Sequence, residues 1–248
     1  MAIETSPEEA TLFDDIGNFA KSLWEKSRKV EGPFTDPRMI SIMLFRRLWS
    51  NHRGYALLWK NGFSLEADII LRSGIEASIC IAANEAKRGE FVELLRRDAC
   101  ATVKGQITML RDDGDDDRAR EAEAVLQDML SKRPDDYRPD RLRWKDLAEA
   151  GGVPKLYGWY RQLSGMSSHV TGASILRGIE FADGVTPGGN VPAIERKMHL
   201  MMMAGATLEG SRRHAAMLKD EEEYGNAVDL LNRLAELSKQ WPRAVKDV

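Results

Sequence analysis

The sequence is poor in cysteine, with only Cys80 and Cys100 among its 248 residues. Both lie in segments with helical patterning, so a disulfide framework and a zinc site with four cysteine ligands are disfavoured. The chain lacks the run of about 18 apolar residues that a membrane-spanning helix requires. Its first residues have neither the basic start nor the apolar stretch of a signal peptide. These absences predict a cytoplasmic protein with no membrane partner.

A strong charge of either sign is also lacking, because 36 basic and 39 acidic side chains leave a formal charge of -3. No global field attracts nucleic acid or an anionic membrane, although a local basic patch is compatible with this balance. The hydrophobic fraction of 43% and the charged fraction of 30% are typical of globular chains. We expect a single domain over residues 1–248, with a sub-division near 133–143, where Pro134 and Pro139 interrupt the patterning.

Motifs for cofactors and metals are missing as well. There is no phosphate-cradling glycine loop, dinucleotide fingerprint, nucleophile elbow or zincin helix. The acidic stretch 111–118 lacks the ligand spacing of an EF-hand and is predicted to connect two helices. Glu195 and His199 are spaced as metal ligands on one helix face, but the methionines of 198–203 around them favour core packing. Neither a cofactor nor a metal is predicted.

Helical periodicity is what the chain has throughout. Ser6-Pro7 and Asp36-Pro37 are helix start signals, and apolar residues then recur at helical spacing. The expected helices cover about 7–32, 37–61, 64–87, 90–110, 117–132, 144–150, 154–164, 190–218 and 220–241. No strand-type alternation occurs. The sequence therefore predicts an all-α, up-and-down multi-helix bundle with one irregular excursion over about 164–190, a length of loop that often carries function.

The third expected helix carries two charges on an otherwise apolar surface. At 100° per residue, Arg72 and Glu76 fall within about 40° of a stripe of apolar residues, and the opposite side is apolar too. Such a helix should lie centrally, where charges are costly unless they are paired. Two interpretations stay open. The pair forms a polar centre with Arg72 available to a phosphate or carboxylate, or it is a structural ion pair that fixes helix register.

The start of the excursion places a histidine beside hydroxyl groups. His169 follows a helix end that carries Tyr160 and Ser164, and a histidine there can exchange protons near neutral pH. If this segment folds back onto the third helix, His169 forms a general acid/base centre with Arg72, Glu76 and Tyr160. The alternative is a loop histidine that caps carbonyl groups.

These segments are similar to those of a known family. The run from Leu71 to Glu76, with a leucine-arginine-serine-x-x-glutamate pattern, and the tyrosine-x-x-leucine-serine segment that ends at Ser164 before His169 resemble a widespread bacterial family of helical proteins of unknown function. The resemblance covers about residues 55–180.

A more distant resemblance is to the HEPN helical domains of toxin, anti-phage and RNA-processing systems. Members that cut RNA without a metal use an arginine and a histidine at a dimer interface. Arg161 and His169 match these residue types, but seven residues separate them, more than in the family pattern. The resemblance implies a homodimer that binds or cleaves RNA in a defence or stress response.

Three functions follow from these patterns. The first is RNA binding or cleavage, with Arg72, Glu76 and His169 as the catalytic candidates and Tyr160, Arg161 and Ser164 as the binding candidates. The second is a non-enzymatic interaction or regulatory protein. The third is a small-ligand sensor with a pocket inside the bundle. Whether the protein is an enzyme stays open.

Overall fold

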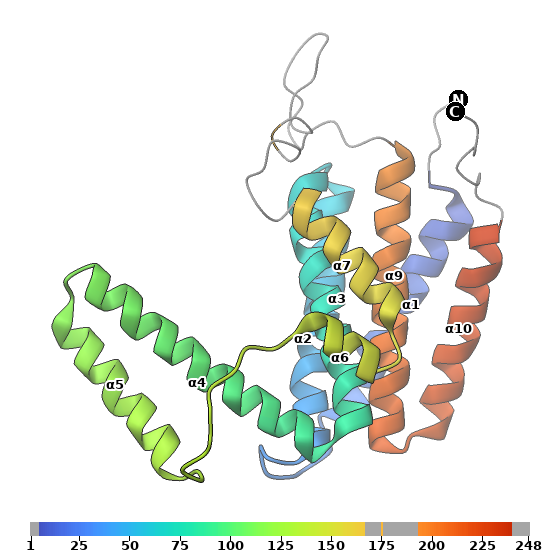
Figure 1. The fold of residues 1–248 in the computed structure, drawn as a ribbon. Coiled ribbons are helices and arrows are strands. Elements are labelled where there is room, and N and C mark those ends of the chain that lie inside the picture. The colour runs from blue at the N-terminus through green and yellow to red at the C-terminus, as the bar shows by residue number, and fades with distance from the viewer. Residues whose placement is uncertain (1–4, 167–174, 176–192, 240–248) are drawn as a thin grey trace.

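The computed structural model describes residues 5–166, 175 and 193–239. Within these residues the elements are helices, and no strand occurs. The helices are α1 (Pro7–Ser27), α2 (Pro37–Lys60), α3 (Ser64–Lys87), α4 (Gly89–Asp112), α5 (Asp116–Ser131), α6 (Trp144–Ala150), α7 (Pro154–Met166), α9 (Ala193–Leu218) and α10 (Glu221–Lys239). The predicted all-α bundle is confirmed (Figure 1).

The predicted helix starts have the expected chemistry. Ser6 accepts a hydrogen bond from the backbone N–H of Glu9, whose side chain accepts one from the backbone N–H of Ser6. This reciprocal capping box satisfies backbone donors that the first helical turn leaves free. At α2 the carboxylate of Asp36 accepts from the backbone N–H of Arg38, and Pro37 occupies the first turn. Both helices begin where the sequence places them.

Helix α3 lies at the centre of the bundle, as predicted, and packs against α2, α4, α6, α7 and α9. It contributes Leu71, Ile75, Ile79 and Ile81 to the main core, and all four are fully buried. Gly74 permits the close approach of α9, because a Cβ atom there would stand 2.9 Å from the terminal methyl of Met203. A side chain at this position would require the end of the Met203 side chain to move.

A hairpin arm made by α5 and the outer part of α4 projects from the bundle (Figure 1). It has a small hydrophobic cluster of its own, formed by Cys100, Ile107, Leu126 and Tyr137. The segment after α5, residues 133–143, contains no helix, as the prolines there predict. It returns along α4, where the carboxylate of Asp98 accepts from the backbone N–H of Leu142 at 3.0 Å.

Two predicted helix ends are wrong. α1 ends at Ser27 rather than near residue 32, and its Ser27 hydroxyl donates to the carbonyl of Leu23. α7 continues through Met166, so residues 164–166 belong to a helix and not to the irregular excursion. Glycine at 165 is tolerated there because it lies near the helix end. The rest of the predicted excursion falls outside the described residues, apart from Ile175.

The acidic stretch is a helix connection, as predicted. α4 ends at Asp112, Gly114 adopts a φ of 77°, and the Asp115 carboxylate accepts from the backbone N–H of Arg118 to cap α5. In the part of the chain that the structure describes, no helix is long and apolar enough to cross a membrane.

Candidate functional site

Arg72 and Glu76 form an ion pair on α3. Their side chains approach to 3.3 Å and are 22% and 21% exposed, so the pair is mostly buried but opens to solvent on one side. The four-residue spacing places both side chains on one helix face, which is why they meet. The charges therefore lie at the edge of the core.

Tyr160 of α7 joins this pair. The Arg72 guanidinium carbon lies 5.0 Å from the centre of the Tyr160 ring, and its Nη2 donates to the tyrosine hydroxyl at 3.4 Å. Leu156 and Leu163 are buried on the same side of α7, which turns Tyr160 toward α3. The structure thus brings together Arg72, Glu76 and Tyr160, which the sequence nominated from two distant segments.

Helix α2 adds two residues that sequence reasoning missed. Asn51 Nδ2 and Arg47 Nη2 donate to the Ser73 hydroxyl at 3.1 and 3.2 Å. Their four-residue spacing in the sequence predicts that they share one face of α2. That this face meets Ser73 is shown only by the packing of α2 on α3. Arg47 also places a second positive charge near Glu76.

Burial raises the pKa of the Glu76 carboxyl, and the nearby charges of Arg72 and Arg47 only partly offset this rise. Glu76 therefore exchanges protons closer to neutrality than an exposed glutamate does. Among the described residues, no acceptor lies within hydrogen-bond distance of the buried Arg72 Nε. The Arg72 guanidinium thus retains a donor beyond its contacts with Glu76 and Tyr160.

The other nominated residues lie farther along α7. The Ser164 hydroxyl donates to the carbonyl of Tyr160 at 2.7 Å, so its proton is used within the helix. Arg161 is exposed on the next position after Tyr160. His169 lies outside the described residues, so its predicted approach to Arg72 and Glu76 stays a prediction.

A hollow of about 720 Å³ lies beside this group, between the start of α6 and the second half of α7. We call it the α6–α7 hollow. Its aromatic walls are Trp144, Tyr157 and Tyr160. The Tyr160 ring centre lies 5.6 Å from that of Trp144 and 6.0 Å from that of Tyr157. The three rings form one cluster, and its central member also carries the Arg72 contact.

Cationic side chains outnumber carboxylates in the lining of the α6–α7 hollow, although the whole chain is slightly acidic. Arg143, Lys145 and Arg161 line it together with one carboxylate, that of Asp146. The nearest ion-pair partners of Arg143 and Lys145 are at 3.7 and 3.8 Å on exposed side chains, contacts that contribute little. Asp140 and Glu149 thus lie beside two of the three lining cations, and Arg161 is the one with no carboxylate in ion-pair distance among the described residues.

The pair Glu195 and His199 belongs to the core, as predicted. His199 is 1% exposed, and its Nδ1 lies 2.6 Å from the carboxylate of Asp68 on α3. This contact ties α9 to α3. No cluster of three or more metal-ligating side chains suited to an ion occurs among the described residues. Asp68 was missed because no sequence spacing relates it to His199.

Comparison with known proteins identifies the family. A family of unknown function, DUF5677, matches residues 38–185. The chain belongs to this family. The matched region contains α2 to α7, and therefore Arg72, Glu76, Tyr160 and the α6–α7 hollow. The predicted membership in a helical family of unknown function is confirmed. No curated protein and no solved structure gives a significant match.

Proposed function

We propose that this protein binds single-stranded RNA in the α6–α7 hollow. The observation that carries the proposal is the combination of three clustered aromatic rings with three cations around one hollow. Proteins that hold single-stranded nucleic acid use this combination, because bases stack on aromatic rings while cations contact the phosphates. Exposed bases and a flexible backbone fit such a hollow better than a stiff duplex does.

Arg72 and Glu76 support this binding surface from behind. The guanidinium of Arg72 contacts the Tyr160 ring and donates to its hydroxyl, while Glu76 holds the guanidinium in place. The ring is therefore fixed before RNA binds, which lowers the entropy lost on binding. Arg161 and Ser164 lie on the same wall, where Arg161 is free to contact a phosphate.

The proposal is tested by fluorescence anisotropy with a short labelled single-stranded RNA. We expect saturable binding that Arg161→Glu weakens by about tenfold or more, since a phosphate contact is replaced by repulsion. Lys155→Glu is the matched control, because Lys155 is an exposed cation on another face of α7. Absence of binding, or equal weakening by both charge reversals, would contradict the proposal.

Metal-independent cleavage of the bound RNA is a second candidate, favoured by the raised pKa of Glu76 next to the cation of Arg72. In this reaction the 2′-hydroxyl oxygen attacks the adjacent phosphorus and the bond to the 5′ oxygen breaks, leaving a cyclic phosphate. One group accepts the 2′-hydroxyl proton and another gives a proton to the departing 5′ oxygen. His169 and Glu76 would take these roles, with Arg72 stabilising the phosphate charge. This requires the cleaved phosphate to lie beside the α6–α7 hollow, on the solvent-open side of the Arg72–Glu76 pair.

Cleavage is measured in the presence of EDTA with the same RNA. We expect cyclic-phosphate products from the native protein and none from His169→Ala, with RNA binding and thermal stability unchanged. Ser167→Ala is the neighbouring control and should cleave normally. Cleavage by His169→Ala at the native rate, or no cleavage by the native protein, would remove this candidate while leaving RNA binding in place. Sedimentation of the same samples tests the homodimer that the HEPN resemblance implies.

A further inference from the structure

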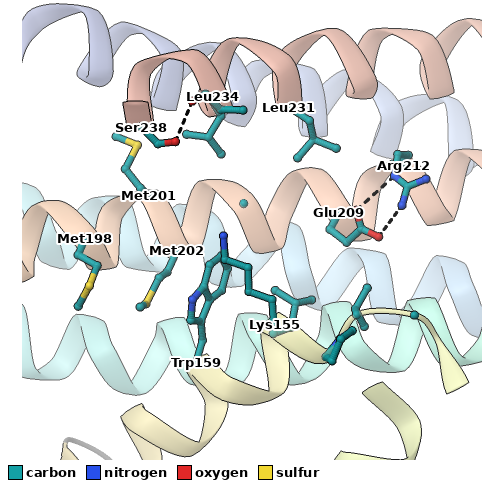
Figure 2. A pocket seen from close by; sticks show the side chains of 16 residues that line it. Lys155, Trp159, Met198, Met201, Met202, Glu209, Arg212, Leu231, Leu234 and Ser238 are labelled. Atoms are coloured by element: carbon teal, nitrogen blue, oxygen red, sulfur yellow. Dashed lines mark hydrogen bonds and ion pairs between the residues drawn. The ribbon is translucent and has the colours of Figure 1, made fainter. Parts of the chain in front are cut away.

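A second cavity, of about 650 Å³, lies on the other side of α7, where α7, α9 and α10 meet. We call it the methionine cavity. Figure 2 shows its largely apolar walls. These are formed chiefly by Trp159, Met198, Met201, Met202, Leu231 and Leu234. Its volume is typical of sites for small molecules, and thioether side chains adapt to ligands of varied shape.

Gly205 of α9 sets the width of this cavity. A Cβ atom at this position would stand 3.3 Å from the Trp159 ring and 3.8 Å from Leu234. Trp159 therefore leans against the bare backbone of α9 and leaves space beside the methionines. A larger side chain at 205 would displace the ring.

One cation of the methionine cavity has no anionic partner in the part of the chain that the structure describes. Burial acts to raise the pKa of Glu209, but hydrogen bonds from Arg212 and Arg213 outweigh burial and hold that pKa below its ordinary value. Glu209 is thus a fixed anion, which Arg212 and Arg213 approach to 2.6 and 2.9 Å. Arg213 also pairs with Glu85 at 2.7 Å.

Lys155 remains. Within the described residues no carboxylate lies in ion-pair distance of Lys155, and its ammonium stands 5.2 Å from the Trp159 ring centre. Figure 2 shows its side chain running beside Trp159 between α7 and α10. Counted over the described residues, the three cations Lys155, Arg212 and Arg213 therefore face two carboxylates, those of Glu209 and Glu85, so this region favours an added negative charge.

We propose that the methionine cavity binds a small amphipathic carboxylate, with the hydrocarbon chain among the methionines and the carboxylate on Lys155. A cationic ligand would be repelled, and a neutral apolar ligand would leave the charge of Lys155 without a partner. Each methylene that the cavity buries should improve affinity by about fourfold. This inference is independent of RNA binding, because it concerns another face of α7.

Calorimetric titration of the full chain with sodium decanoate below its micelle concentration tests this inference. We expect saturable binding at one site, and hexanoate should bind about 250-fold more weakly because four methylenes are lost, each contributing about fourfold. Lys155→Met should weaken decanoate binding about tenfold while decanol still binds. Lys145→Met is the matched control, since Lys145 is an exposed lysine that lines the α6–α7 hollow instead.

A cavity-filling variant distinguishes a blocked cavity from a misfolded protein. Ala235 is exposed at the rim of the methionine cavity, so Ala235→Trp should fold normally by circular dichroism yet abolish decanoate binding. The proposal is overturned if decanoate gives no saturable heat, if the two lysine variants behave alike, or if Ala235→Trp binds normally. A concentration-dependent dimer that Ala235→Trp disrupts, without decanoate binding, would assign the cavity to a second copy of the chain and equally overturn it.

Discussion

Helix α7 separates two hollows of similar size and opposite chemistry. On one side Tyr157, Tyr160 and Arg161 line a basic, aromatic surface, and on the other Lys155 and Trp159 line an apolar one. Both sides place a cation near an aromatic ring, Arg72 at 5.0 Å from Tyr160 and Lys155 at 5.2 Å from Trp159. The difference lies in the partners of the cation.

Arg72 is anchored by Glu76 and the Tyr160 hydroxyl, whereas Lys155 has no carboxylate partner among the described residues. An anchored cation organises its neighbours, and an unanchored one is available to a ligand. We therefore expect Arg72 to affect RNA binding in the α6–α7 hollow through Tyr160, and Lys155 to contact its ligand directly. On these proposals the same pair of residue types, a cation and an aromatic ring, is structural on one side of α7 and binds a ligand on the other.

The largest difference between the two sides should be the effect of salt concentration on ligand affinity. If Arg143, Lys145 and Arg161 each replace one counterion, the logarithm of RNA affinity falls with the logarithm of salt concentration with a slope of about −2. Tenfold more salt then weakens RNA binding about 100-fold. Decanoate binding, which involves one ion pair and mainly hydrocarbon burial, should show a slope shallower than −1. Parallel titrations in increasing KCl measure both slopes, and equal slopes would abolish the distinction.

Removal of one aromatic ring from each side gives the next largest effect. Tyr160→Ala should weaken RNA binding by about 10- to 100-fold, since stacking on one ring contributes about 1–3 kcal/mol. Trp159→Leu is the counterpart on the other side and should leave RNA affinity within about twofold, the scale of experimental error for a remote change. Anisotropy titrations of both variants decide the matter. A larger loss of RNA affinity from Trp159→Leu than from Tyr160→Ala would contradict RNA binding in the α6–α7 hollow.

The anchored and unanchored cations should differ in their contribution to folding. Arg72→Ala should lower the free energy of unfolding by about 1–3 kcal/mol, because Glu76 loses its nearest partner at a mostly buried position. The loss stays below that of a fully buried pair because solvent and Arg47 still reach Glu76. Lys155→Met should change it by less than about 0.5 kcal/mol, as expected for an exposed side chain. Urea unfolding provides both values, and equal losses would contradict the assignment of roles.

The scaffold that carries both sides should weaken in acid. His214 of α9 accepts and donates hydrogen bonds with Ser41 and Ser27 at 2.8 Å, and burial lowers its pKa to about 3. The Ser27 hydroxyl donates to Leu23, so it accepts from His214 Nε2–H, and Nδ1 accepts from Ser41. The folded state therefore holds neutral histidine.

The unfolded chain takes up this proton below a pH of about 6.5, the ordinary pKa of histidine. The stability due to neutral His214 is fully present above that pH and is lost as the pH falls toward 3. The slope is at most about 1.4 kcal/mol per pH unit for one proton. Burial lowers the pKa of His52 to about 4, so a second proton contributes over nearly the same range. Urea unfolding between pH 7 and 5 gives the change in the free energy of unfolding per pH unit. This change should be smaller for His214→Asn than for the native chain, and an equal change would contradict this account.

Local patterns predicted much of the fold and part of the site. The helix starts at Pro7 and Pro37 follow from capping chemistry, and the central position of α3 follows from its apolar surface. The pairing of Arg72 with Glu76 follows from helical spacing. These features depend on residues within a few positions of each other, where a regular helix fixes the geometry.

Contacts between distant segments were harder to predict from the sequence. The resemblance to a known family nominated Tyr160 together with Arg72, but spacing alone does not show that α7 crosses α3 at this turn. The contacts of Asn51 with Ser73 and of Asp68 with His199 were missed, because each depends on how two helices are rotated against each other. The projecting arm was missed for the same reason, since α4 has helical patterning over its whole length.

The location of bound RNA tests the central claim most directly. Ultraviolet cross-linking of the native protein to single-stranded RNA, followed by mass spectrometry of the peptides, identifies the contacted side chains. The account predicts cross-links to Trp144, Tyr157 or Tyr160 in the α6–α7 hollow, and their loss in Arg161→Glu. Cross-links confined to the hairpin arm or to the methionine cavity, or cross-links unchanged in Arg161→Glu, would contradict it.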